Sequence, residues 1–273
     1  MKLDEAVRPA NRRAFLRNAG MASVGLAGAA IVGSRVGSKF SFKPVDVQAA
    51  SNYSDAEILN FALNLEYLEA EFYAVSTYGA TLVQLGVITE SETTGPTTGG
   101  NMVKNFGASP LAFLATGLRE DEIAHVRYLR SALGSEAVKK PAIDLNALGY
   151  GFSSVDNWLI LARQFEDVGV SAYLGAAPLI SSSTYLAAAA AILGTEAQHS
   201  GSIRSACIQN QVSSPAVDSY DVPPTYKIPY DVDSNALSIP RTPAEVLKIV
   251  YGGGECSGGF YPAGMNGSIV CRS

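Results

Sequence analysis

The two histidines of the chain both stand three residues after a glutamate. The pairs are Glu122 with His125 and Glu196 with His199, and the 273 residues contain no other histidine. In an α-helix, residues three apart lie on one face, so both side chains of a pair can reach a single ion. One such pair is common by chance, whereas two pairs that use every histidine predict a shared metal site inside a helical fold.

Two tyrosines repeat a second spacing. Tyr73 follows Glu66 by seven residues, and Tyr173 follows Glu166 by the same interval. Seven residues make about two helical turns, so each glutamate and its tyrosine lie on the same face of a helix. Along the chain the Glu-Tyr and Glu-His frames alternate. This order predicts two copies of a helix pair, related by an approximate twofold axis through the shared site.

Four long segments have the apolar spacing of helices, at about 54–78, 109–133, 154–177 and 183–211. Ser54 with Glu57 forms the pattern of a capping box, and Ser109 followed by Pro110 is typical of a helix start. The first and second connections between these segments are long, and the third is short. With 47% hydrophobic residues to build a core, the sequence predicts an all-α four-helix bundle over residues 51–211.

Residues 212–273 are rich in proline and glycine, and we expect a C-terminal extension with one short helix. Thr242, Pro243 and Glu245 provide the start of that helix. The aromatic and apolar content argues against full disorder, so the extension should wrap on the bundle or contact another subunit of a homo-oligomer. Cys256 and Cys271 lie close together in it, which predicts a disulfide, with three unpaired thiols as the alternative.

Residues 1–50 are basic, unlike the rest of a chain whose net charge is −5. Arg12 and Arg13, then Phe15 and Leu16, then a weakly apolar run of alanine and glycine, resemble a twin-arginine export signal followed by a linker. The run is shorter than the roughly 20 residues of a membrane span. We therefore expect twin-arginine machinery to deliver the chain to the periplasm or outside the cell, with a disordered basic arm as the alternative. The acidic balance argues against nucleic acid as a partner.

A metal site inside a bundle needs carboxylates from the helices that face the two histidines. The candidates on the first and third helices are Glu66, Glu69, Glu71, Glu166 and Asp167. The tyrosine spacing favours Glu66 and Glu166, and Glu69 is the rival to Glu66. Other acidic residues are expected to face solvent or to pair with arginines. They are Glu120, Asp121 and Asp167, with Arg119, Arg127 and Arg163 as partners.

The full pattern resembles the ferritin-like superfamily of dinuclear carboxylate proteins. The segments "LNFALNLEYLEAEFY", "DEIAHVRYLRSALG", "FEDVGVSAYLGAAPLI" and "EAQHSGSIR" are similar to the ferritin-like domain of desiccation-related proteins. The resemblance implies that Glu122 and Glu196 bridge two metal ions. It also implies that Glu66 and Glu166 are terminal carboxylates and that His125 and His199 each bind one ion. By the same resemblance, Tyr73 and Tyr173 orient the carboxylates.

The chemistry of the donor set agrees with that resemblance. Four carboxylates neutralise two divalent cations, and oxygen-rich sites with some imidazole suit iron or manganese, so we expect two such ions per chain. The interpretation is an exported stress-protection protein that oxidises metal with oxygen or peroxide, or removes peroxide. The alternative is a non-enzymatic structural or protectant protein of the envelope. Iron storage in a cage is disfavoured by the long extension and uneven loops.

Overall fold

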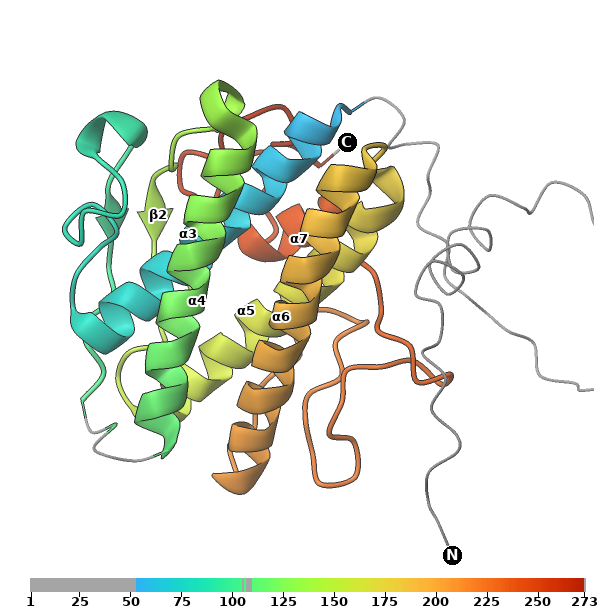
Figure 1. Ribbon diagram of the computed structural model, residues 1–273. Coiled ribbons are helices and arrows are strands. Elements are labelled where there is room, and N and C mark those ends of the chain that lie inside the picture. Colours follow the sequence, from blue (N-terminus) through green and yellow to red (C-terminus); the bar gives the residue numbers. More distant parts are fainter. Residues whose placement is uncertain (1–52, 105, 107–109, 273) are drawn as a thin grey trace, which may run out of the picture. The chain divides into compact units, whose positions relative to one another are not determined.

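Four long helices build the part of the chain that the computed structural model describes, residues 53–104, 106 and 110–272. They are α3 (Asp55–Tyr78), α4 (Pro110–Leu133), α5 (Val155–Ala176) and α6 (Ser183–Gln209), labelled as in Figure 1. Helix α3 packs mainly against α4, and α5 mainly against α6. The predicted all-α four-helix bundle is confirmed. The predicted export segment and Ser109 lie outside the described residues.

Local sequence signals set the helix ends. The Ser54 hydroxyl accepts a hydrogen bond from the Glu57 backbone N–H, and the Glu57 carboxylate accepts one from the Ser54 backbone N–H at 2.8 Å, so the predicted capping box forms. Gly79 ends α3 in the left-handed region, with φ at 74°. The hydroxyl of Ser154 caps α5 by accepting from the backbone N–H of Asn157.

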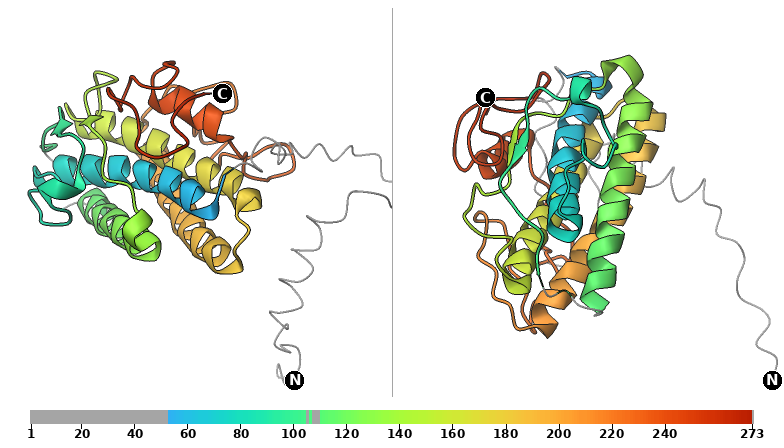
Figure 2. Two further views of the ribbon diagram at one scale, coloured as in Figure 1. Left: turned by 90° about the horizontal axis from the view of Figure 1, so that it is seen from above. Right: turned by 90° about the vertical axis from the view of Figure 1, so that its left-hand side faces the viewer.

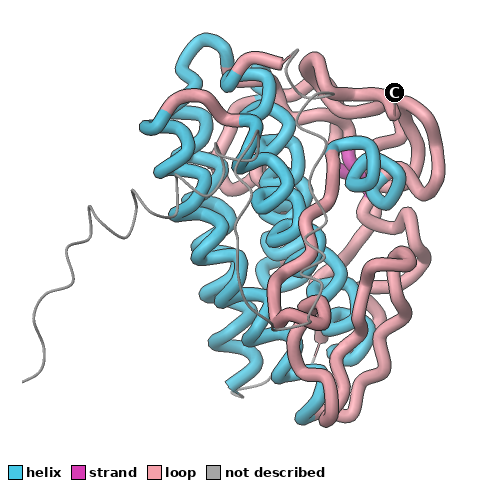
Figure 3. The backbone as a smooth tube through the Cα atoms, turned by 90° about the vertical axis from the view of Figure 1, so that its right-hand side faces the viewer, coloured by secondary structure: helices cyan, strands magenta, loops and turns pink. Residues whose placement is uncertain are grey.

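The helices and the C-terminal extension form layers. Figure 2 shows α4 and α6 on one side, α3 and α5 in the middle, and the extension with its short helix α7 (Pro243–Val250) on the other side. The same division is visible in Figure 3, where loops gather on the side away from α4 and α6. Because α3 is covered on both sides, it is buried at every residue from Ile58 to Ser76.

Two short strands join the long loops. Strands β1 (Thr97–Thr98) and β2 (Ile143–Asp144) pair in parallel, with Thr97 opposite Ile143. Three 3-10 turns, at Glu90–Glu92, Gly134–Glu136 and Ala177–Leu179, complete the connections. These strands are not predictable from the sequence, because a segment of two residues has no detectable alternation.

The last part of the extension is fixed to α3 by hydrogen bonds. The Tyr261 hydroxyl donates to the Asn64 carbonyl at 2.7 Å, and the Asn266 backbone N–H donates to the Asn64 side chain at 3.1 Å. A disulfide joins Cys256 to Cys271, and Cys207 is a buried free thiol. The extension therefore wraps on the bundle, as expected. Contact with another subunit stays a prediction.

A buried ionic network fixes the first part of the extension to α5 and α6. Arg163 donates to both carboxylate oxygens of Asp221 at 2.7 and 2.6 Å. Asp167 accepts from Arg204 at 2.6 Å and lies 3.4 Å from Arg163. The expectation that Asp167 faces solvent is wrong, because these arginines and the Ser200 hydroxyl, at 2.6 Å, satisfy it in the interior. Pairing with Arg163 was predicted, and pairing with Arg204 was not.

The extension also passes very close to α5. The Arg241 backbone N–H donates to the Ser171 carbonyl at 3.0 Å, and a β-carbon placed on Gly175 would lie 1.9 Å from the Arg241 carbonyl oxygen. Only glycine permits this approach. Among the described residues, no helix has the length and apolar character needed to cross a bilayer.

Candidate metal centre

The six predicted ligands meet in the middle of the bundle. All four glutamates are fully buried, and His125 and His199 are 9% and 6% exposed. Their donor atoms form two groups, each within 4.8 Å: Glu66, Glu122, His125 and Glu196, and Glu122, Glu166, Glu196 and His199. Glu122 and Glu196 belong to both groups. This sharing is the arrangement that bridging carboxylates require.

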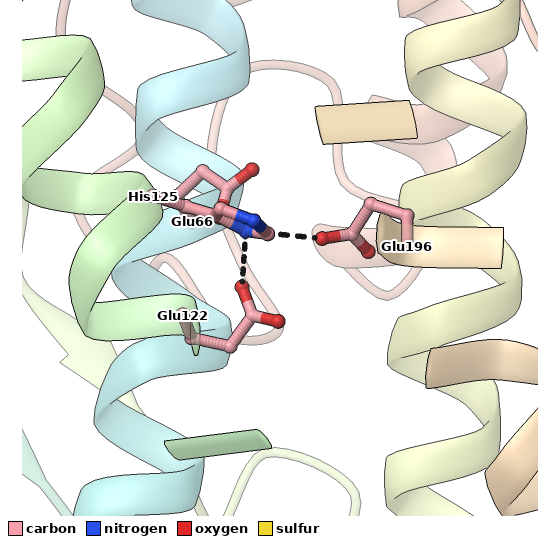
Figure 4. Close-up of side chains that lie close together, drawn as sticks. All are labelled: Glu66, Glu122, His125 and Glu196. Atoms are coloured by element: carbon pink, nitrogen blue, oxygen red, sulfur yellow. Dashed lines mark hydrogen bonds and ion pairs between the residues drawn. The ribbon is translucent and has the colours of Figure 1, made fainter. Parts of the chain in front are cut away.

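Three carboxylates surround one nitrogen of His125. Its Nδ1 lies 3.2 Å from Glu66 Oε2, 3.2 Å from Glu122 Oε2 and 3.3 Å from Glu196 Oε1. Figure 4 draws the contacts with Glu122 and Glu196 as dashed lines. These carboxylates come from α3, α4 and α6. A single ring N–H can donate one good hydrogen bond, so it cannot satisfy all three oxygens. Donors that converge from several helices in this way are typical of the ligands of a cation.

His199 repeats the arrangement on the other side. Its Nδ1 lies 2.9 Å from Glu122 Oε1 and 3.4 Å from Glu166 Oε2. The two imidazole rings are 6.0 Å apart. Each histidine thus turns Nδ1 toward Glu122 and toward one further glutamate, and His125 also approaches Glu196. The predicted approximate twofold relation between the two helix pairs is visible in these contacts.

The two tyrosines bind glutamates across the bundle. Tyr73 on α3 donates its hydroxyl hydrogen to Glu166 Oε1 on α5, and Tyr173 on α5 donates to Glu66 Oε1 on α3. Burial and the neighbouring glutamate raise the pKa of each phenol well above its usual value. Both tyrosines therefore remain hydrogen-bond donors to the carboxylates. The spacing along each helix predicted that glutamate and tyrosine face the site, but not that each tyrosine binds the opposite helix.

Several buried donor atoms of the cluster have no hydrogen-bond partner among the described residues. They are Glu122 Oε1, Glu166 Oε2, both carboxylate oxygens of Glu196, and His199 Nδ1. Their charged neighbours are the two histidines, and two imidazoles cannot neutralise four buried carboxylates, whose uncompensated charge costs several kcal/mol. Divalent metal ions would satisfy these atoms and neutralise the four carboxylates together. The residues present therefore fit a metal site.

Protons are held in the cluster in the absence of metal. Burial, together with the charge of Glu66, raises the pKa of Glu122 to about 7. Burial opposes protonation of His199, yet its close contacts with the carboxylates of Glu122 and Glu166 raise its pKa to about 12. A metal ion that binds here must displace such protons, so metal affinity should increase with pH.

Two rival carboxylates of α3 have different surroundings. Glu69 is buried beside the cluster but belongs to neither ligand group. A β-carbon placed on Gly169 would lie 3.1 Å from Glu69 Oε1 and 2.7 Å from Glu196 Oε2, so this glycine makes room for both glutamates. Glu71 points to the following loop, where it accepts a hydrogen bond from the Leu82 backbone N–H at 3.1 Å.

Asp121 is a functional candidate that the sequence analysis assigned to solvent or to an arginine. Its side chain is 56% exposed, but its Oδ2 lies 3.1 Å from Nε2 of His199. Glu120 pairs with Arg119 at 3.4 Å, as expected. Asp121 stands directly before Glu122 in the sequence. That position was the only available signal, because the partner of Asp121 lies on another helix.

Comparison with known proteins identifies relatives of the whole bundle. The family model of the ferritin-like domain matches residues 54–209, more than half of the chain. The desiccation-related protein PCC13-62 of Craterostigma plantagineum is 28% identical over 169 residues, which cover 55% of this chain and 52% of that protein. The ferritin-like catalase Nec2 of Nesocodon mauritianus is 25% identical over 288 positions, which cover 85% and 90%. The chain thus spans about half of the first relative and most of the second.

Proposed function

The chain belongs to the ferritin-like domain family, and from that premise we propose that it binds two iron or manganese ions and protects against oxidative or desiccation stress. The favoured reaction is removal of peroxide, with oxidation of metal by oxygen or peroxide as the second reaction. The observation that carries the proposal is the set of buried carboxylate and imidazole atoms without hydrogen-bond partners among the described residues.

The ligand roles follow from the two groups of donors. Glu122 and Glu196 would bridge the ions, because both groups contain them. The ions would each take one further glutamate and one histidine, Glu66 with His125 and Glu166 with His199. Bound ions would supply redox and Lewis-acid chemistry. Tyr73 and Tyr173 hold the terminal carboxylates in place, and burial of the glutamates limits the access of water.

The choice of peroxide removal rests on a relative. The ferritin-like catalase Nec2 aligns with 85% of this chain. Disproportionation of peroxide yields water and oxygen and needs no further reductant, which suits a protein outside the cytoplasm. The name of the desiccation-related relative states no reaction, so a non-enzymatic protectant role is the alternative proposal.

Metal content and peroxide consumption test the proposal together. The wild-type chain, loaded with Mn²⁺ or Fe²⁺ and desalted, should retain two ions and release oxygen from peroxide. His125→Ala and His199→Ala should each weaken metal binding by orders of magnitude, because each ion loses its imidazole. Gln198→Ala, an exposed neighbour of His199 on α6, is the matched control and should behave like the wild type.

The outcomes separate the alternatives. If the wild type retains no more metal than a His125→Ala, His199→Ala double variant, the metal proposal is wrong. Retention of two ions without peroxide consumption or oxygen uptake would favour the protectant role. Metal should also stabilise the folded chain, by roughly 2.7 kcal/mol at 100 times the dissociation constant for one site.

Export is a separate part of the proposal. The paired Arg12 and Arg13 before an apolar run support it, and so does the disulfide between Cys256 and Cys271, since disulfides persist mainly in oxidising compartments. The Arg12→Lys, Arg13→Lys variant should accumulate in the cytoplasm with its first residues uncleaved. Normal export and cleavage of that variant would contradict the twin-arginine interpretation.

A further inference from the structure

The outer nitrogens of the two histidines have different neighbours. His199 directs Nδ1 toward Glu122 and Glu166, and its Nε2 lies 3.1 Å from Oδ2 of Asp121 on α4. Across residues 53–104, 106 and 110–272, the ion-pair contacts of His125 all involve Nδ1. Its Nε2 thus has no carboxylate within ion-pair distance in that part of the chain.

The sequence explains the difference. Under the approximate twofold relation, Glu122 is equivalent to Glu196 and His125 is equivalent to His199. The counterpart of Asp121 is therefore the residue before Glu196. That residue is Thr195, whose hydroxyl donates to the Ala191 carbonyl of its own helix at 3.4 Å. The two helix pairs therefore offer the same ligands, but only one of them supplies a carboxylate to the outer nitrogen of the opposite histidine.

A carboxylate at the outer nitrogen affects how a histidine binds metal. When Nε2–H donates to Asp121, the proton is fixed on Nε2, and the lone pair of Nδ1 faces the glutamates. The hydrogen bond also fixes the ring orientation and makes Nδ1 a stronger donor. Loss of such outer partners typically lowers metal affinity by about 10- to 100-fold. Since the Asp121 side chain is 56% exposed, water weakens the effect, and we expect the lower end of that range.

We propose that Asp121 is a positioning residue for His199 and makes the two metal positions unequal. The position formed by His199, Glu166 and the bridging glutamates binds its ion about tenfold more tightly than the position that contains His125. This inference rests on the proposed function, since it requires that the cluster bind two ions. It predicts that the position with His199 fills before the position with His125, and that Asp121 causes this order.

Titration of the metal-free full chain with Mn²⁺ tests the inference, with calorimetry and electron paramagnetic resonance as readouts. The wild type should bind in two steps that differ about tenfold, and a sample with one equivalent should show mainly the spectrum of isolated Mn²⁺. Asp121→Asn should weaken the tighter step about tenfold, so the steps merge and spin-coupled pairs appear at one equivalent. Circular dichroism verifies that the variant is folded.

Thr195→Asp is the matched variant, because it places a carboxylate at the twofold-related position. It should tighten the weaker step and also bring the two affinities together. Two equal steps in the wild type, or an Asp121→Asn variant with both affinities within twofold of the wild type, would overturn the inference and leave the proposed function standing. A wild type that binds no Mn²⁺ would instead overturn the proposed function itself.

Discussion

The α3–α4 pair and the α5–α6 pair bring the same ligand frames to the site but are held by different kinds of contact. Helix α3 is fixed to the extension by neutral hydrogen bonds of the buried Asn64 with Asn266, at 2.9 and 3.1 Å, and Arg130 of α4 donates to the Tyr67 hydroxyl of α3 at 2.6 Å. The α5–α6 pair is held by charges. Arg163 and Arg204 bind Asp221 and Asp167 where little solvent reaches them.

This comparison separates two requirements of the centre. The proposed ligands obey the approximate twofold relation, as the proposed binding of two similar ions would require. The surrounding support need not obey it, because amide hydrogen bonds and ion pairs can each fix a helix in place. The two kinds of contact differ in the free energy lost when one partner is removed, since a buried charge without its partner is far more costly than an unpaired amide.

The largest effect is expected at the ionic network. Asp167→Ala removes the only carboxylate that accepts a hydrogen bond from Arg204 among the described residues. The free energy of unfolding of the metal-free chain should fall by about 3–5 kcal/mol, the usual result when one partner of a buried pair is lost. Urea denaturation followed by circular dichroism measures this change.

Asn64→Ala is the control in the other pair. It should cost about 1–3 kcal/mol, the penalty for leaving neutral buried groups without partners. If Asn64→Ala destabilises the chain more than Asp167→Ala, the loss of a buried charged partner between α5 and α6 does not outweigh the loss of neutral hydrogen bonds at α3.

The pH dependence of the metal-free chain should give the next largest effect. The pKa of Glu122 is raised from 4.5 to about 7, and that of His199 is raised from 6.5 to about 12. In both cases the folded chain binds more protons than the unfolded chain, so stability is lost as pH rises. The contribution of Glu122 is lost between about pH 4.5 and 7, and that of His199 above about pH 6.5.

Across pH 5 to 8 the free energy of unfolding should therefore fall, as measured by urea denaturation at each pH. Saturation with Mn²⁺ should remove or reverse the trend, because metal replaces the protons. A metal-free chain that becomes more stable over this range would contradict the assignment of retained protons to the cluster.

The smallest effects are expected from the crossed tyrosines. Tyr73→Phe and Tyr173→Phe each remove one hydrogen bond to a buried carboxylate and keep the packed ring. Each substitution should lower the free energy of unfolding of the metal-loaded chain by about 1.5 kcal/mol. The two losses should be equal if the twofold relation includes the tyrosine–glutamate hydrogen bonds. Calorimetric melting of both variants side by side gives the comparison. A difference above about 1 kcal/mol would show that the two pairs already diverge at the tyrosines.

Spacing along a helix made the buried cluster of glutamates and histidines predictable. Glu122 with His125 and Glu196 with His199 are local patterns, and the repeat at seven residues selected Glu66 and Glu166 among several candidates. The bundle followed from four long apolar segments with capping signals. These features depend on neighbours in the sequence, which is why one sequence was enough to find them.

Contacts across helices were not predictable in the same way. The approach of Asp121 to His199 depends on how α4 and α6 cross, and the pairing of Arg204 with Asp167 depends on how α5 and α6 pack. Local patterns favoured solvent or a nearby arginine for Asp121 and Asp167, because most acidic side chains on helices are exposed or paired. The buried ionic network became visible only with the path of the extension.

The crossed tyrosine–glutamate bonds have a consequence for anyone who would redesign this centre. Because Tyr73 reaches from α3 to Glu166 on α5, and Tyr173 reaches back to Glu66, a change on one helix alters the donor environment on the other. Libraries that randomise a single helix will therefore sample mostly mismatched combinations. Randomisation should couple positions 66 and 173, and positions 73 and 166, so that each selected clone carries both members of a pair.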